Sequence, residues 1–186
     1  MRLMNNWKHR LPLAALLLAL AACSTPPLPA TYAQELPKLD VQQYFNGTLD
    51  AHGIFQDRSG RVVKRFTVVL RANWHGDTGT LDEDFTYADG SRQRRVWTLR
   101  KTAPGRFIGT APDVIGQAVG EVAGNALRWQ YVLALPVDGT VYHVDFEDWM
   151  FLMDDKVMLN RAAMSKFGFS LGAVTLSFSK RPQAAP

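Results

Sequence analysis

Apolar and polar residues alternate with a period of two over several long stretches of this chain. Between residues 62 and 74 the even positions are mostly apolar, ending in Trp74, while the odd positions include Arg65 and Asn73. A second row of alternating apolar residues runs from Trp129 to Leu135. Since successive side chains of a β-strand point to opposite faces, this pattern is typical of half-buried strands in an antiparallel sheet. No long amphipathic helical pattern competes with it.

Short turn signals separate these stretches. They are Asp57–Gly60, His75–Asp77, Asp89–Gly90, Pro104–Gly105, Gly124–Asn125, Asp138–Gly139 and Asp154–Asp155. Asp-Gly between apolar runs is the strongest short-range signal for a hairpin. We therefore predict nine or ten consecutive strands, at residues 45–56, 61–75, 78–88, 92–101, 105–111, 117–123, 126–136, 139–153, 156–166 and 172–180. The long run 139–153 has room for a bend or a bulge.

A meander with this many strands has to protect its two edges, and closure into a barrel does so. The predicted fold class is therefore all-β, an antiparallel up-and-down barrel that encloses either packed side chains or one small ligand. A two-sheet sandwich is the alternative, which the succession of short hairpins disfavours. A membrane-spanning barrel is also disfavoured. Its outer face must be continuously apolar, whereas charges such as Arg65 and Arg71 recur at alternate positions.

The N-terminal residues have the pattern of a secretory signal. Basic residues precede a short apolar run, and small residues lead to Cys23, the one cysteine of the chain. The run is too short for a membrane span, which needs roughly 20 residues, and an ordinary cleaved signal does not require a cysteine there. The residues from Leu20 to Cys23 resemble a bacterial lipobox. This resemblance implies that Cys23 is acylated and becomes the mature N-terminus.

This motif sets the expected organisation and location of the protein. We expect a lipoprotein signal peptide at 1–22, an acylated cysteine and proline-rich tether at 23–40, a β-barrel domain at 41–181 and a disordered tail at 182–186. Two or more acyl chains hold a protein stably on a membrane. Ser24 favours the outer membrane over the inner membrane, by analogy with enteric bacteria. The predicted location is the periplasmic face of the outer membrane.

The net charge argues against a nucleic-acid partner. The chain has 21 lysines and arginines against 17 acidic residues, which gives a formal net charge of +4. The signal peptide carries three basic residues and no acidic ones, so the mature chain is left with +1. Because a nucleic-acid-binding domain needs a basic patch, we expect no partner of this class.

A densely charged hairpin is predicted at residues 81–97. With a two-residue turn at Asp89–Gly90, Asp84 lies opposite Arg95. Opposite charges across a strand pair stabilise a sheet by a few tenths of a kcal/mol to about 1 kcal/mol, and this structural role is one interpretation. The other is that Asp84, Arg95 and Trp97 point into the barrel, where the planar guanidinium fixes a polar head group.

Two further clusters lie nearer the C-terminus. Asp145, Glu147 and Trp149 share one strand face, and Asp148 lies on the other. We interpret these carboxylates as members of structural salt bridges, because arginines are numerous and no fixed spacing supports a glycosidase or a metal site. Lys166 follows on a later strand, where it either binds an anionic head group or is an exposed lysine at a strand end.

Motifs for catalysis are absent from the sequence. His52, His75 and His143 are widely separated, and no Gly-x-Ser-x-Gly elbow, zinc-ligand pair, P-loop or dinucleotide fingerprint occurs. We expect no catalytic residue, no metal site and no cofactor. The evenly spaced Gly116, Gly120 and Gly124 are interpreted as marks of bulges or tight packing around residues 116–125.

Several short sequence segments resemble those of a family of proteobacterial lipoproteins that carries a domain-of-unknown-function label. They are Tyr44–Gly47, Phe55–Arg58, Leu81–Phe85, Arg94–Trp97, Val122–Ala126, Asp148–Met150 and Asn160–Ala162. The resemblance covers residues 40 to 180 and implies a lipocalin-like (calycin-type) barrel. It also implies a lipid-related role in the cell envelope, because genes of the family often lie near enzymes that modify membrane fatty acids. It supplies no catalytic residues.

The alternation and the resemblance together predict a fatty acyl or other lipid-like ligand in the lumen of the barrel. The predicted ligand-binding residues are Arg65, Asp84, Arg95, Trp97, Trp129, Tyr131, Trp149 and Arg161, and Phe66, Trp74 and Met150 are further candidates for the wall. The expected partners are the membrane, through Cys23, and an envelope protein. Two alternatives stay open. One is a structural or partner-binding lipoprotein with no small ligand, and the other is a lipid-modifying enzyme.

Overall fold

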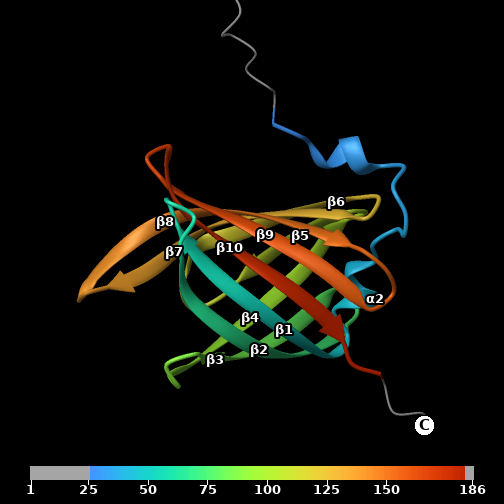
Figure 1. Cartoon of the computed structure of the whole chain (residues 1–186). Helices are drawn as coiled ribbons and strands as arrows, with labels where there is room; N and C mark the ends of the chain where they lie inside the picture. Colours follow the sequence, from blue (N-terminus) through green and yellow to red (C-terminus); the bar gives the residue numbers. More distant parts are fainter. Residues whose placement is uncertain (1–25, 183–186) are drawn as a thin grey trace, which may run out of the picture.

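The computed structural model describes residues 26–182, which form a closed antiparallel barrel of ten strands (Figure 1). Each strand pairs with its neighbour in the chain, and β1 pairs with β10 to close the barrel. The strands are β1 (Gly47–Asp57), β2 (Val62–His75), β3 (Thr78–Tyr87), β4 (Arg92–Ala103), β5 (Arg106–Thr110), β6 (Val114–Ala123), β7 (Ala126–Val137), β8 (Thr140–Leu152), β9 (Val157–Lys166) and β10 (Phe169–Lys180). The predicted all-β up-and-down barrel is confirmed.

The predicted strands match the observed ones closely. β6 and β10 each begin three residues earlier than predicted. β8 pairs without a register shift with both β7 and β9, so no bulge lies within residues 140–152. The lipobox-like motif with Cys23 lies outside the described residues. No helix within residues 26–182 is both long and apolar enough to cross a membrane.

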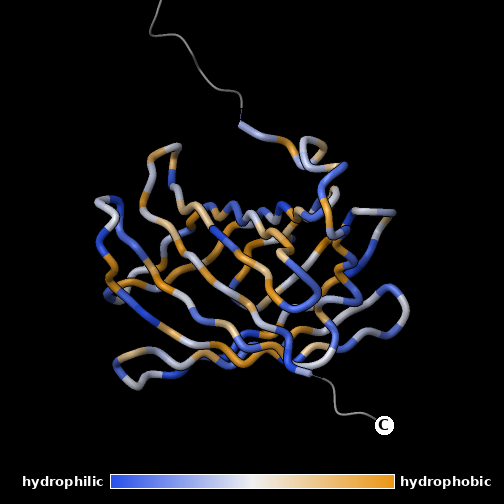
Figure 2. The backbone as a smooth tube through the Cα atoms, turned by 45° about the vertical axis from the view of Figure 1, so that its right-hand side comes forward, coloured by the Kyte–Doolittle hydropathy of each residue, from blue (hydrophilic) through white to orange (hydrophobic). Residues whose placement is uncertain are grey.

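Side chains alternate between the lumen and the outer wall, as the sequence pattern predicts. The tube in Figure 2 changes repeatedly between hydrophobic and hydrophilic residues along the strands. Leu49, Leu70, Val144 and Met158 are the largest fully buried side chains, and each occupies an inward-facing position of its strand. The apolar interior of the barrel is therefore its hydrophobic core.

A short helix, α2 (Val41–Tyr44), closes one end of the barrel, which we name the base. The Asp40 carboxylate caps the helix by accepting a hydrogen bond from the Gln43 amide at 3.0 Å. The Trp74 indole on β2 donates to the Phe45 carbonyl at 2.8 Å and holds the segment in place. The opposite end, the mouth, consists of the turns β1–β2, β3–β4, β5–β6, β7–β8 and β9–β10.

Residues 29–40, expected to be part of an extended tether, pack on the outer wall of the barrel. A 3₁₀ turn, η2 (Pro29–Tyr32), places the Tyr32 ring edge-on to two rings of β8, Trp149 at 5.7 Å and Phe151 at 5.1 Å between centroids. A backbone hydrogen bond to the β6–β7 turn holds the end of the segment. Proline-rich composition favours an extended chain, but the buried aromatic contacts outweigh that preference here.

The β3–β4 turn is longer than predicted. Backbone hydrogen bonds join Tyr87 N to Ser91 O and Gly90 N to Tyr87 O, each at 2.9 Å. Gly90 has a φ of +84°, and Asp89 accepts hydrogen bonds from the amide and hydroxyl of Ser91. This is a three-residue loop with glycine in the left-handed region, a common hairpin alternative to the two-residue turn.

The extra turn residue shifts the β3–β4 register by one position. Glu83, rather than Asp84, pairs with Arg95. A one-residue shift moves a side chain to the opposite face of the sheet, so Glu83 faces the lumen. Asp84 lies exposed on the outer wall, where it forms an ion pair with Arg71 of β2 at 2.6 Å. The predicted pairing of Asp84 with Arg95 is therefore wrong.

Inward-facing glycines make room for large aromatic rings. A Cβ atom on these glycines would come within 2.4 to 2.6 Å of a ring atom. The pairs are Gly53 with Phe66, Gly79 with Trp74, and both Gly109 and Gly120 with Trp129. Gly116 has a φ of +70° at the register shift between β6 and β7. The prediction that Gly116 and Gly120 mark a bulge and tight packing is confirmed.

Candidate functional site

The inward-facing side chains are buried near the base and more exposed near the mouth. Phe55, Phe66, Phe85 and Tyr87 face inward near the mouth, yet all four side chains are partly exposed. Because the closed wall shields these residues from the sides, solvent reaches them through the mouth. Their rings contact one another, with centroid separations of 5.7 to 6.3 Å within the group Phe66, Phe85 and Tyr87. We name these four residues the aromatic cup.

A second layer of aromatic residues lies deeper in the lumen. Trp97 lies edge-on to Trp129 at 5.8 Å and to Tyr131 at 5.4 Å. Tyr131 stacks on Phe146 of the neighbouring strand at 5.1 Å with an interplanar angle of 12°. Rings in these geometries stabilise one another beyond simple burial. The layer forms an aromatic wall below the cup.

Arg95 projects into the lumen beside these rings and pairs with Asp113 from the β5–β6 turn. Its Nη2 and Nε atoms donate to Asp113 Oδ2 at 2.7 and 2.9 Å. The Arg95 side chain is 15% exposed, and its guanidinium carbon lies 5.7 Å from the centroid of the Phe85 ring. The guanidinium is therefore fixed in position and has its charge balanced at the inner edge of the aromatic cup.

Glu83 lies next to Arg95 on the neighbouring strand and faces the same space. Burial raises the pKa of Glu83 to about 7, although the positive charge of Arg95 acts in the opposite direction. The protonated form of Glu83 therefore persists to a higher pH than that of an exposed glutamate. In that state its carboxyl group can donate a hydrogen bond as well as accept one.

A second inward-facing carboxyl group, Asp148 of β8, is 6% exposed. Burial raises its pKa to about 7, against the lowering effect of a hydrogen bond from the Asn160 side chain. Burial also raises the pKa of the Tyr131 phenol. Together six residues form a band of polar groups across the lumen, which we name the polar belt: Glu83, Arg95, Asp113, Tyr131, Asp148 and Asn160.

Two acceptor atoms of the polar belt are buried without a donor among the described residues. They are Oδ1 of Asp148 and Oδ1 of Asn160, the latter on a residue that is 4% exposed. A buried polar atom left without a hydrogen bond costs about 1 to 3 kcal/mol. Each atom is therefore a place where a hydrogen-bond donor from a bound molecule is stabilising.

Half of the predicted ligand-binding residues face the lumen. Arg95, Trp97, Trp129 and Tyr131 point inward, in the deep layer and the polar belt. The other four lie on the outer wall. Asp84 and Arg161 are exposed there, Arg65 is exposed near the β1–β2 turn, and Trp149 packs against Tyr32. These four do not line the lumen. Among the further wall candidates, Phe66, Trp74 and Met150 occupy inward-facing positions.

Sequence reasoning missed the inward-facing polar residues Glu83, Asp148 and Asn160. The strand faces around Asp148 were predicted correctly, but its neighbour Glu147 is the one that forms the expected salt bridge, with Arg128 at 3.0 Å. A carboxylate among Phe146, Met150 and other apolar residues on one strand face was the available signal. No such signal pointed to Asn160, because both faces of its strand mix apolar and polar residues.

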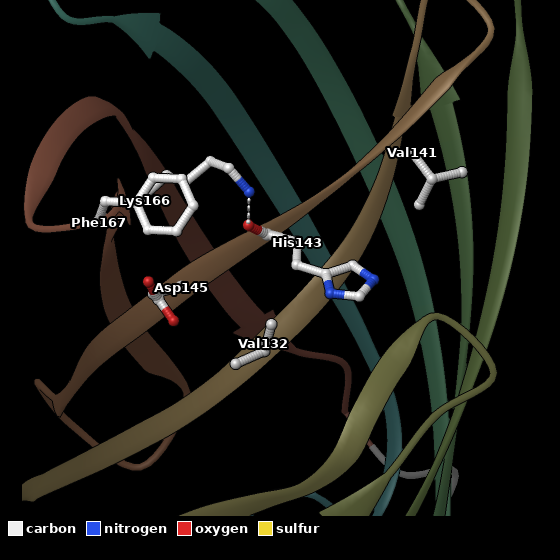
Figure 3. Close-up of a pocket in the computed structure, with 6 residues that line it drawn as sticks. All are labelled: Val132, Val141, His143, Asp145, Lys166 and Phe167. Carbon is white, nitrogen blue, oxygen red and sulfur yellow. Dashed lines mark hydrogen bonds between the residues drawn. The ribbon is translucent and has the colours of Figure 1, made fainter.

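Two surface hollows adjoin the mouth. The larger, about 530 Å³, lies on the outer wall and is lined by Val132, Val141, His143, Asp145, Lys166 and Phe167 (Figure 3). The smaller, about 320 Å³, lies between the β1–β2 and β3–β4 turns and reaches Tyr87 of the aromatic cup. Over residues 26–182 no three His, Cys, Asp or Glu side chains are grouped as a metal ion requires.

The barrel is similar to two solved structures of low sequence identity. The S-type phycobiliprotein lyase CPES from Guillardia theta matches with a TM-score of 0.56 and 7% identity, covering 86% of this chain and all of that one. Rv2717c from M. tuberculosis matches with a TM-score of 0.55 and 15% identity, covering 80% of this chain and all of that one. At these identities the similarity is one of fold, and it bears out the predicted lipocalin-like barrel.

No curated protein matches the chain in sequence. A family described as "Protein of unknown function (DUF3833)" matches residues 17–180, from the apolar run before Cys23 to the last residue of β10. Because this match spans most of the chain, the protein belongs to the DUF3833 family.

Proposed function

We propose that the barrel binds a lipid-like ligand, with an acyl chain in the aromatic cup and an uncharged polar end on the polar belt. The observation that carries this proposal is the pair of buried, unpartnered acceptor atoms on Asp148 and Asn160, in a barrel whose mouth is lined by partly exposed aromatic residues. Ligand sites are typically concave and mostly apolar, with a few placed polar groups. The lumen has this composition.

The charges of the polar belt favour an uncharged polar end. Arg95 is already neutralised by Asp113, while Glu83 and Asp148 carry partial negative charge at neutral pH. A free carboxylate would add a negative charge to this set, and an unpaired buried charge is costly. A hydroxyl or amide group can instead donate to the unpartnered acceptors. A monoacylglycerol-like ligand fits better than a fatty acid anion.

The location of the protein belongs to the same proposal. The lipobox-like residues before Cys23 support a lipid anchor at that cysteine, and Ser24 supports the outer membrane. A lipid-binding barrel on the periplasmic face would then act in envelope lipid metabolism. Replacing Cys23 (Cys23→Ala) should prevent incorporation of labelled palmitate. Retained labelling would overturn the anchor.

Native mass spectrometry with three palmitoyl probes tests the ligand. The chain should begin at Pro26, because residues 29–40 pack on the barrel and the core lies between Leu39 and Phe178. The probes are 1-palmitoylglycerol, palmitate and methyl palmitate, which share one acyl chain. We expect 1-palmitoylglycerol to bind about tenfold more tightly than the other two, since it alone is both uncharged and a hydrogen-bond donor.

A matched pair of variants locates the bound probe. Asp148→Leu removes a lumen acceptor, whereas Asp145→Leu changes an exposed residue of the same strand. We expect Asp148→Leu to weaken binding about tenfold without loss of thermal stability, and Asp145→Leu to bind as the parent does. Absence of binding by every probe would favour the structural or partner-binding alternative.

A further inference from the structure

The β9–β10 turn presents the two most exposed large apolar side chains at the mouth, Phe167 at 84% and Phe169 at 76%. Leu171, on the same hairpin, is 38% exposed. Exposed apolar residues scattered singly are ordinary, but three at one hairpin tip form a patch. The patch lies outside the lumen and takes no part in the polar belt.

The backbone conformation of this turn is unfavourable for the bulky side chain of Phe167. Phe167 has a φ of +50° and is followed by Gly168 at +79°. Left-handed backbone is costly for a bulky residue, and this turn shape favours Asn or Asp in the first position. The β7–β8 turn has the same geometry, with Asp138 at +47° and Gly139 at +80°. The β9–β10 turn therefore displays an aromatic ring at a conformational cost.

Lys166 accompanies these rings. Its ammonium group lies 4.8 Å from the Phe167 ring centroid and 5.9 Å from that of Tyr142, and it donates to the His143 carbonyl at 2.9 Å. Figure 3 shows Lys166 and Phe167 together at the edge of the outer hollow. Aromatic rings that enter the lipid interface, beside a lysine that reaches the phosphates, are typical of membrane-contacting segments.

The mouth turns are also basic as a group. Apart from the Arg95–Asp113 pair, the basic residues around the mouth are Arg58, Arg61, Lys64, Arg65, Arg92 and Lys166, and the acidic residues are Asp57, Asp89, Asp138 and Asp145. This excess of positive charge complements a surface of anionic lipid phosphates. The attraction reinforces apolar insertion.

The position of the β9–β10 turn relative to the start of the described chain also supports contact with a lipid surface. In both Figure 1 and Figure 2 the β9–β10 turn and the first described residues project from the upper side of the barrel. Cys23 precedes those residues by a few positions. A lipid anchor there and the hairpin tip would therefore meet one membrane on the same side of the protein.

We propose that the β9–β10 turn is a membrane-docking element that inserts Phe167 and Phe169 among the lipids and places Lys166 at their phosphate groups. The occupant is a bilayer surface that contains anionic phospholipid. This contact is independent of both the acyl anchor and the ligand in the lumen. It orients the mouth of the barrel beside the membrane surface.

Co-sedimentation with vesicles tests the proposal. The chain beginning at Pro26 is mixed with vesicles of phosphatidylcholine and phosphatidylglycerol in equal parts, so that lipidation at Cys23 cannot contribute. We expect binding that falls at least tenfold in the double variant Phe167→Asn with Phe169→Ser. Asn is compatible with the left-handed turn, so we expect this variant to melt no lower than the parent. Equal binding by the two chains would overturn the proposal.

A control separates the hairpin from other sources of binding. Val63→Ser removes an exposed apolar residue near another mouth turn. We expect it to bind vesicles as the parent does. If the double variant instead abolishes self-association in sedimentation velocity and leaves vesicle binding intact, the patch is a protein contact and membrane docking is wrong.

Discussion

The Trp129 indole occupies the space that a Cβ atom on Gly120 would need. A Cβ atom at position 120 would lie 2.4 Å from the ring, and one at position 109 would lie 2.6 Å from it. The indole therefore lies over β5 and β6 and fills the space that the two glycines leave free. This arrangement ties the deep aromatic layer to particular glycines rather than to general apolar packing.

Replacing Gly120 by alanine should destabilise the barrel by about 1 to 3 kcal/mol, because an extra methyl group in a packed core forces a ring or strand to move. In a Trp129→Leu background the same replacement should cost much less. Urea unfolding of the parent, the two single variants and the double variant measures the coupling energy between positions 120 and 129. Equal costs in both backgrounds would show that the ring does not set the requirement for glycine.

The two raised carboxyl pKa values should make the barrel more stable in mild acid than at neutral pH. Glu83 and Asp148 hold protons in the folded state at pH values where the unfolded chain has released them. Their unfavourable contribution is absent below the unfolded pKa values, near 4, and grows as pH rises to about 7. Thermal melting at pH 5 and pH 8 should show the higher melting temperature at pH 5.

Glu83→Gln should reduce that difference by raising the melting temperature at pH 8 more than at pH 5. Asp84→Asn is the matched control, since Asp84 lies exposed on the outer wall one residue away. It should leave the pH dependence unchanged. A parent protein with equal stability at both pH values would contradict the burial of these carboxyl groups.

Trp74→Phe should loosen the base of the barrel. The phenyl ring still packs against Gly79, but the hydrogen bond from the indole to the Phe45 carbonyl is lost. We expect the free energy of unfolding to fall by about 1 to 2 kcal/mol. Amide exchange in α2 should become faster than in the parent, and exchange in the strands should change less. Unchanged exchange in α2 would mean that the apolar contacts of Phe45 alone hold the helix.

Tyr32→Ala should release the N-terminal segment from the barrel without unfolding it. The Tyr32 ring contacts Trp149 and Phe151, and both are on the outer wall rather than in the core. Proteolysis near Lys38 should become at least several-fold faster, while the melting temperature of the barrel changes little. A matched Tyr142→Ala change at the mouth should leave cleavage near Lys38 as it was.

The strand pattern was readable from sequence because the period of two and the turn residues act locally. Val68, Leu70 and Val144 are buried where alternation places them, and Asp-Gly pairs mark two of the mouth turns. These signals need no knowledge of distant contacts. They indicated nine or ten strands in a consecutive meander, and the inward face wherever one face is purely apolar.

The candidate site was harder to read because it depends on register and on distant partners. One additional residue in the β3–β4 turn exchanges Asp84 for Glu83 on the inner face. Likewise, the pairing of Arg95 with Asp113 joins residues from β4 and the β5–β6 turn. Trp149 shows the same limit, since its partner Tyr32 comes from a proline-rich segment with no periodic signal.

Closure of the barrel depends on the last of its ten strands. β1 pairs with β10 along most of its length, and Arg181 pairs with Asp50 beyond the end of that ladder. Until residues 169–180 emerge from the ribosome, β1 and β9 both present open edges that can pair with other chains. Loss of only the final strand should therefore produce an aggregating protein rather than a slightly smaller barrel.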